Sequence, residues 1–246
     1  MSRCSERVKG ELLKEAQRLS ETELDQFSRK IRIYYVLSCF DEKYMDSCFA
    51  TISSGILAGA VKGLCYDADA KMGKDQVTVN LPVRVNWGGG WSDTPPYCME
   101  HGGTVLNAAV LDGNCPIEVV VKKVDEPVIV LASADSGAEQ TFTDISSLQD
   151  SSNPYDPFAL HKAALIACGV IPYKDPISVQ EITENLGSGL YLSTQVINIP
   201  RGSGLGTSSI LAGACVKALY EMLGKEVTDE ELYDRVLCME QIMSTG

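Results

Sequence analysis

The amino-acid sequence predicts an α+β fold preceded by a helical segment. Apolar residues recur at three- or four-residue intervals through the first seventy positions, which is the periodicity of amphipathic helices. From residue 76 the period changes to two, as in a strand buried on one face, and helical spacing returns after residue 158. Strands that gather early, with helices around them, favour an α+β fold over a regular βαβ series.

The helical lead is expected over residues 1–72, and a polar linker leads from it into a second domain at 76–246. Within the lead, the apolar spacing predicts one helix over about 24–37 and another over about 46–64. No residue pattern in this lead indicates chemistry. A helical spacer or a docking surface is therefore the expected role.

The second domain opens with a strand whose alternating apolar positions are Val77, Val79, Leu81, Val83 and Val85. Further strands are expected at 104–111, 117–123, 128–132 and 190–199, and helices at 158–167 and 208–223. The last helix is expected to begin after Thr228, where Glu231 completes a capping box, and to run to about Met243. The domain thus has a sheet early in the chain and helices late in it.

Charge and cysteine usage narrow the functional class. The 246 residues include 33 acidic and 21 basic side chains, a net charge of −12, which disfavours nucleic acids and anionic membranes as partners. Nine cysteines without a C-x-x-C pair argue against a zinc site or thioredoxin chemistry and fit a reducing compartment. With a charged N-terminus and no apolar run near 20 residues, a cytoplasmic protein is expected.

A glycine-rich loop between a predicted strand and a predicted helix is the strongest local signal. Alternating glycines let a ligand approach the backbone, and the start of the next helix attracts anions. Its hydroxyls are also suitable oxygen ligands for Mg²⁺. These features predict a phosphate-binding loop. Its candidate residues are Pro200, Gly202, Ser203, Gly204, Leu205, Gly206, Thr207, Ser208 and Ser209.

Two other glycine-rich motifs do not fit this loop. The spacing is G-x-G-x-G rather than G-x-G-x-x-G, and Glu226, at the right distance for a ribose-binding acid, has no strand before it. A Walker loop also fails because no G-K-S/T is present. Dinucleotide binding and P-loop chemistry are therefore disfavoured.

A second constellation occupies residues 82–96. A strand with an inward-facing Arg84 runs into three glycines, with Gly90 and Trp91 next to one another, and then into Asp93 beside two prolines. A carboxylate can accept hydrogen bonds from pairs of hydroxyls, and Trp faces pack on sugar rings. The segment is either a site for a polyhydroxylated ligand or a tight turn in which Asp93 is a cap, and the residues alone leave both open.

Together, in this order and about 110 residues apart, the two segments resemble the GHMP kinases. The loop at 200–209 is similar to that family's P-x-G-S-G-L-G-S-S motif, with Thr207 in place of the first Ser. Within the family, VNWGGGWSDTPPYCMEHGGTVLNAAV at 85–110 resembles L-fucokinases most, and the bacterial heptose kinases next. The resemblance covers about 77–246 and implies a GHMP kinase N-terminal domain, of the ribosomal protein S5 domain 2-like fold.

The resemblance implies an ATP-dependent kinase that phosphorylates the anomeric hydroxyl of L-fucose, with ATP held by the 200–209 loop. It makes Ser208 a ligand of Mg²⁺ and Glu240 a second one, although a solvated helix glutamate remains the alternative for Glu240. Asp93, with Gly90 and Trp91, would bind the sugar. Arg84 would lie beside the catalytic aspartate and favour its charged form.

One departure from the family bears on catalysis. In these kinases the catalytic aspartate and a C-terminal domain follow the helix that contains Glu240, whereas this sequence ends at Gly246. We therefore expect an incomplete form that binds better than it transfers phosphate. The alternatives are a non-catalytic nucleotide-binding fragment and a sibling kinase that acts on a heptose or another sugar. The expected partners are ATP and a small sugar, and the sequence does not predict an oligomeric state.

Overall fold

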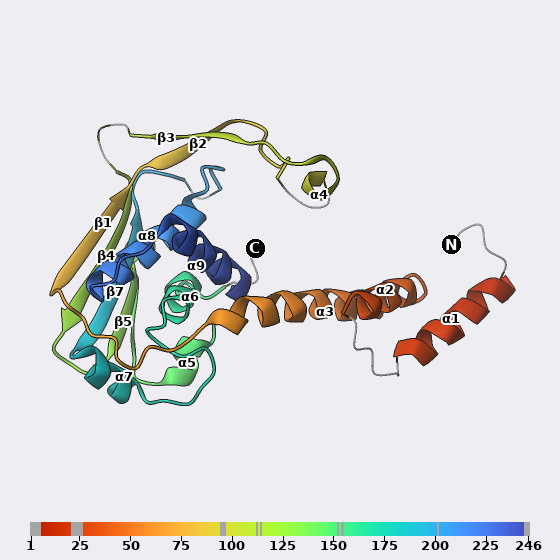
Figure 1. Ribbon diagram of the computed structural model, residues 1–246, viewed down its shortest axis with the longest axis horizontal. Helices are drawn as coiled ribbons and strands as arrows, with labels where there is room; N and C mark the ends of the chain where they lie inside the picture. The colour runs from red at the N-terminus through yellow and green to blue at the C-terminus, as the bar shows by residue number, and fades with distance from the viewer. Residues whose placement is uncertain are drawn as a thin grey trace. The chain divides into compact units, whose positions relative to one another are not determined.

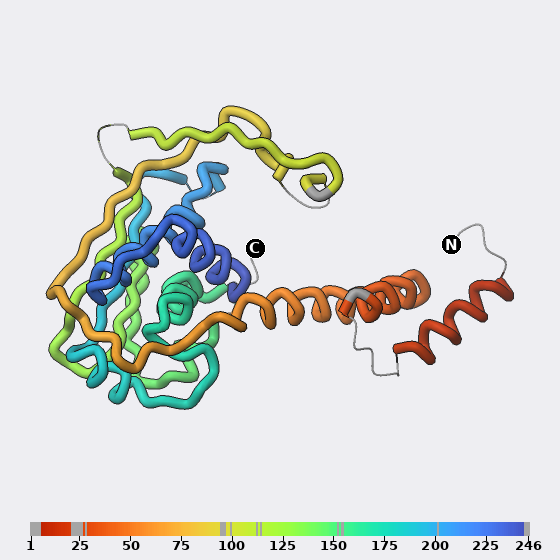
Figure 2. Tube along the Cα trace, viewed as in Figure 1, coloured from red at the N-terminus to blue at the C-terminus, as the bar shows by residue number. Residues whose placement is uncertain are grey.

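The computed structural model describes residues 6–20, 27–93, 97–111, 113, 115–151, 153, 155–200 and 202–243. The chain divides into two compact units, Met1–Lys62 and Gly63–Gly246. Figure 2 traces both along the chain. Across the described residues, no helix has the length and apolar character needed to cross a membrane.

The first unit is helical, as the apolar spacing predicts. It contains α1 (Glu6–Ser20), α2 (Phe27–Ser38) and α3 (Lys43–Ala60), and a short 3₁₀ turn follows at Val61–Gly63. Leu37 of α2 and Cys48 of α3 are buried where these two helices pack. At Gly55 a Cβ atom would lie 2.1 Å from the Phe27 ring, so the glycine allows the ring to lie against α3.

The second unit is built on a five-stranded sheet in the order β1-β4-β7-β5-β6. Neighbouring strands are antiparallel except for β5 and β7, which are parallel. Along β4 the inward residues Ile117, Val119 and Val121 are fully buried, which is the alternation expected of a sheet covered on one face. The strands are β1 (Gln76–Leu81), β4 (Ile117–Val124), β5 (Ile129–Ser133), β6 (Ala138–Phe142) and β7 (Gly189–Val196).

Three helices cover one face of this sheet (Figure 1): α6 (Ala159–Ala167), α8 (Thr207–Met222) and α9 (Asp229–Ile242). α8 packs on β1 and β4, and its small buried residues Ala214 and Ala218 permit a close approach. The Lys122 Nζ on β4 lies 4.3 Å from the centre of the Tyr191 ring on β7. Two shorter helices, α5 (Ile145–Gln149) and α7 (Val179–Leu186), belong to the same unit.

The strand predicted from 76 to 85 is divided in two. Pro82 separates β1 from β2 (Val83–Gly88), and β2 leaves the main sheet to pair with β3 (Leu106–Val110) as a two-stranded ribbon. Proline has no N–H to donate to a strand ladder, which explains the break at this position. The short helix α4 (Tyr97–His101) lies at the far end of the ribbon (Figure 1). The mixed architecture, with helices ahead of the sheet, confirms the predicted α+β class.

Candidate functional site

The glycine-rich loop adopts a backbone that glycine favours. Gly202, Gly204 and Gly206 have φ angles of 77°, 75° and 68°, in the left-handed region that residues with a Cβ rarely occupy. Gly206 is the N-cap of α8, and no side chain of the described residues caps this end of the helix. The first turn of α8 therefore offers its backbone N–H groups, and the positive end of its dipole, to an anion.

Arg84 lies against this helix start. A Cβ on Gly206 would be 2.5 Å from the Arg84 Nη2, so the third glycine makes room for the guanidinium as well as for the turn. The Arg84 Nη1 donates to the Asn107 Oδ1 at 3.0 Å, across the ribbon from β2 to β3. A cation is thus held beside the end of a helix that already attracts anions.

A carboxylate from α9 reaches the same helix start. The Ser209 Oγ donates to the Glu240 Oε1 at 2.5 Å, between residues 31 positions apart in the sequence. Ser208, which is expected to bind a metal together with Glu240, lines the cavity on the other side of α8. Ser208 and Ser209 thus lie beside two different cavities.

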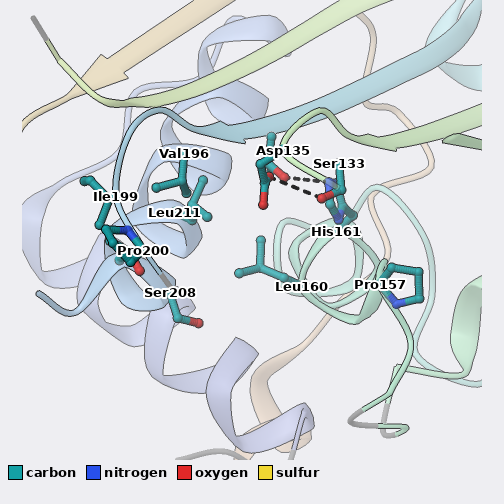
Figure 3. Close-up of a pocket in the computed structure, with 12 residues that line it drawn as sticks. Ser133, Asp135, Pro157, Leu160, His161, Val196, Ile199, Pro200, Ser208 and Leu211 are labelled. Atoms are coloured by element: carbon teal, nitrogen blue, oxygen red, sulfur yellow. Dashed lines mark hydrogen bonds between the residues drawn. The ribbon is translucent and has the colours of Figure 1, made fainter. Parts of the chain in front are cut away.

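The first cavity, of about 210 Å³, lies where β5, β7, α6 and α8 meet. Figure 3 shows Asp135 and Ser208 on its wall, together with the apolar side chains of Leu160 and Leu211. The Ser133 Oγ donates to the Asp135 Oδ1 at 3.3 Å. This cavity therefore combines an apolar lining with a few polar groups and adjoins the glycine loop.

His161, on α6, is buried in the wall of the first cavity. Its Nε2 lies 2.8 Å from the Ala132 carbonyl oxygen and 3.0 Å from the Thr194 Oγ1. Burial lowers the pKa of this imidazole to about 4, so the ring is neutral at pH 7. The neutral ring donates from Nε2 to the carbonyl, and its Nδ1 is a buried acceptor without a partner among the described residues.

The second cavity, of about 540 Å³, lies on the other side of the start of α8. Arg84, Asn107, Gly206, Ser209 and Glu240 line it, and apolar side chains of α8 and α9 complete it. Leu205 lines a third cavity, and the Ser203 amide donates to the Pro200 carbonyl oxygen within the loop at 3.3 Å. The second cavity thus brings Gly206 together with three residues that the sequence predicts separately, Arg84, Ser209 and Glu240.

The sugar-site candidates lie in the turn after β2. A Cβ on Gly89 would be 1.8 Å from the Thr104 carbonyl oxygen, so this position requires a glycine. The Ser92 Oγ stabilises the turn by donating to the same oxygen at 2.9 Å. Trp91 has a positive φ of 73° and is 83% exposed. Asp93 is exposed, and Gly90 lies where a Cβ would be 2.5 Å from the Asn86 Nδ2. Residues 94–96 of the motif lie outside the described part of the chain.

These sugar-site candidates form a group of their own. Their described contacts are with the turn itself and with neighbouring residues of the ribbon, not with the glycine loop. Two further site residues, Asn107 and Asp135, were not predicted. Asn107 lies within the motif at 85–110. It is two positions from Ala109, the residue paired with Arg84, so its place beside Arg84 is known only from the pairing of β2 with β3.

Comparison with known proteins identifies relatives. Residues 177–246 match the family described as the GHMP kinases N terminal domain. The chain is 40% identical over 169 residues to an L-fucokinase/L-fucose-1-P guanylyltransferase of Bacteroides fragilis, a match that covers 67% of this chain and 18% of that protein. It is also 40% identical over 171 residues to a bifunctional fucokinase/GDP-fucose pyrophosphorylase of Arabidopsis thaliana, covering 68% of this chain and 15% of that protein. The chain spans less than a fifth of either relative.

Solved structures show the same fold. The mevalonate kinase of Methanococcus jannaschii is similar with a TM-score of 0.51 at 17% identity, over 70% of this chain and 47% of that one. A second mevalonate kinase structure gives the same TM-score and identity over 68% of this chain and 47% of that one. The second unit therefore shares its architecture with these proteins.

Proposed function

Because this chain carries a GHMP kinase N-terminal domain and resembles fucokinases, we propose that it forms the nucleotide-binding part of an ATP-dependent sugar kinase. The reaction proposed is transfer of the ATP γ-phosphoryl group to the anomeric hydroxyl of L-fucose. The observation that carries the proposal is the start of α8, where three left-handed glycines, the last of them the N-cap, adjoin two cavities. The 40% identity to two fucokinases supports the choice of sugar.

The glycine loop binds the phosphates of ATP. Because the N-cap of α8 is a glycine, which has no side chain to accept from them, the amides of the first turn can donate to phosphate oxygens, and the helix dipole favours their charge. Arg84 adds a cation beside the same turn. These groups offset the overall charge of −12, which would otherwise repel a polyanion.

The nucleobase occupies the first cavity. Its volume of about 210 Å³ is below the range that holds a whole drug-sized ligand and suits a single ring system. Leu160, Val196 and Leu211 supply apolar walls for a flat ring, whereas Ser133 and Asp135 offer polar atoms. Because Ser208 lines the same cavity, a base bound there leaves its phosphates near the glycine loop.

The residues present fit Mg²⁺, which this kind of reaction uses to neutralise phosphate charge. Mg²⁺ prefers oxygen ligands and commonly takes one or two from protein and the rest from phosphates and water. The hydroxyl of Ser209 and the carboxylate of Glu240 are such oxygens on one side of the start of α8, and the hydroxyl of Ser208 is another on its other side. No group of three or more His, Cys, Asp or Glu in the described residues forms a separate metal site, which fits an ion held partly by the nucleotide.

The turn after β2 binds the sugar. Asp93 accepts hydrogen bonds from two hydroxyls, and the exposed ring of Trp91 packs on the C–H face of the pyranose. The φ of 73° at Trp91 supports a role in binding. A non-glycine residue in this strained region is kept there by the contacts of the surrounding turn, and such residues are frequent at binding sites.

Calorimetry with Mg-ATP and an assay of ADP release test the proposal. Binding with one-to-one stoichiometry and sugar-dependent ADP release, greatest with L-fucose, are the expected results. Release that is faster with a heptose would assign a different sugar, and binding without any release would indicate a nucleotide-binding module. Absence of Mg-ATP binding would contradict the proposed function altogether.

A further inference from the structure

We propose that Asn107 is a positioning residue that holds the Arg84 guanidinium at the start of α8 without neutralising it. The full charge of Arg84 then acts on the phosphates of the bound nucleotide. This inference rests on the proposed function, because it names the residue that prepares the phosphate site. Asn107 acts through Arg84 rather than on the ligand.

The ribbon register places the two side chains on one face. Arg84 is paired with Ala109, and Asn86 with Asn107, so Asn107 lies two positions from the residue opposite Arg84. Positions two apart on a strand share a face, and such diagonal neighbours are within reach of a long side chain. The Arg84 Nη1 to Asn107 Oδ1 bond of 3.0 Å follows from this register.

The same face turns the guanidinium toward the glycine loop. The Arg84 Nη2, Nε and Cζ atoms lie 2.5, 3.2 and 3.3 Å from the position of a Cβ on Gly206. Because Nη2 and Nε are nearer to this position than Cζ is, the Nε–Nη2 edge of the guanidinium faces the N-cap residue. Asn107 fixes the guanidinium at Nη1.

The position of the Arg84 guanidinium is electrostatically unfavourable without a ligand. A helix N-terminus carries a partial positive charge, so a cation beside it is repelled. Within the described residues no ion pair involves Arg84, and the carboxylate of Glu240 in the same cavity accepts from Ser209. A neutral amide therefore orients Arg84, and the uncompensated charge favours an anion at this point.

Substitutions at position 107 separate orientation from charge. Asn107→Asp keeps an oxygen where the amide oxygen is, so it retains the bond to Arg84 but pairs its charge with a carboxylate. Asn107→Ala removes the hydrogen bond to Arg84 and leaves the charge of Arg84 unchanged. If Asn107 only strengthened the ribbon, the aspartate would be the milder change, whereas the proposal requires it to be the more harmful one.

The experiment measures binding of inorganic tripolyphosphate and Mg-ATP to the full chain by calorimetry. We expect Asn107→Asp to bind both about tenfold more weakly, close to Arg84→Gln, because a charge-assisted contact is cancelled in each. Asn107→Ala should lose about threefold, since Arg84 remains charged but less ordered. Asn185→Asp is the control. It adds the same charge on α7, where Asn185 donates to the Tyr66 hydroxyl at 3.1 Å, and should bind within about twofold of the unmodified chain.

Thermal melting confirms that each variant folds, and a titration of salt gives a second readout. The slope of affinity against salt should decrease in Asn107→Asp as it does in Arg84→Gln, but not in Asn107→Ala. Equal affinity of Asn107→Asp and the unmodified chain would overturn the inference and leave the proposed function standing. No binding of either probe by the unmodified chain would overturn both.

Discussion

Gly206→Ala and Gly137→Ala form a matched pair that tests the packing at the start of α8. Both glycines have a φ of 68°, so an added methyl group suffers the same backbone strain at either position. At Gly137, in the turn between β5 and β6, nothing lies within 4 Å of the new Cβ. At Gly206 the Arg84 guanidinium occupies that space. The difference between the two variants therefore reports the contact with Arg84, because the backbone strain is the same in both.

The size of the difference follows from the distances. At both sites the left-handed backbone of an alanine lowers the free energy of unfolding by about 1–2 kcal/mol. The smaller conformational entropy of the unfolded alanine variant raises it by about 0.4–1 kcal/mol. At Gly206 the Arg84 Nη2, 2.5 Å from the new Cβ, must also move by about 1 Å to reach an ordinary contact distance. That movement breaks or weakens the 3.0 Å bond to Asn107, at an added cost of about 1 kcal/mol.

Thermal melting and calorimetry measure the consequences. For a unit of this size an added 1 kcal/mol lowers the melting temperature by about 2–4 °C, so Gly206→Ala should melt that much below Gly137→Ala. It should also bind Mg-ATP more weakly, because Arg84 has moved, whereas Gly137→Ala should bind as the unmodified chain does. Equal melting temperatures with equal affinities would refute the packing of Arg84 on Gly206.

Three further outcomes are expected. Below pH 6.5 the unfolded chain protonates His161 but the folded chain, with a pKa of about 4, does not. The free energy of unfolding should therefore fall by about 2 kcal/mol more between pH 7 and pH 5 than in His161→Gln, and parallel pH profiles would contradict this. Ser208→Ala should weaken the Mg²⁺-dependent part of ATP affinity, and Ser209→Ala should do so less. The opposite order would move the metal ligand to the hydroxyl that contacts Glu240. L-fucose should shift the tryptophan emission in Trp87→Phe but not in Trp91→Phe, and a shift that survives only in Trp91→Phe would remove Trp91 from the sugar site.

Much of the fold is predictable because its signals are local. The spacing of apolar residues identifies α2, α3, α6, α8 and α9, and the alternation from Val77 onward identifies the first strand. The capping box at Thr228 marks the start of α9, where the Thr228 Oγ1 accepts from the Glu231 amide at 3.2 Å. The glycine loop is likewise recognised by its own residues, and the family that the loop and the 82–96 segment together resemble is the one that the comparisons find.

The remaining features depend on contacts between distant segments. The spacing of Val79 and Val83 continues without interruption across Pro82, so periodicity alone predicts one strand where two diverge. β6 carries Glu139, Gln140 and Thr141 in succession, a polar run without an apolar alternation. The pairing of Ser209 with Glu240 depends on how α9 packs against α8, and the Asn107 contact depends on the ribbon register.

Titration of the chain with Mg-ATP in a calorimeter shows whether the start of α8 holds the phosphates of ATP. We expect saturable one-to-one binding that Arg84→Gln weakens about tenfold. A chain that melts cooperatively yet gives no heat of binding, or whose affinity is unchanged by Arg84→Gln, would contradict it.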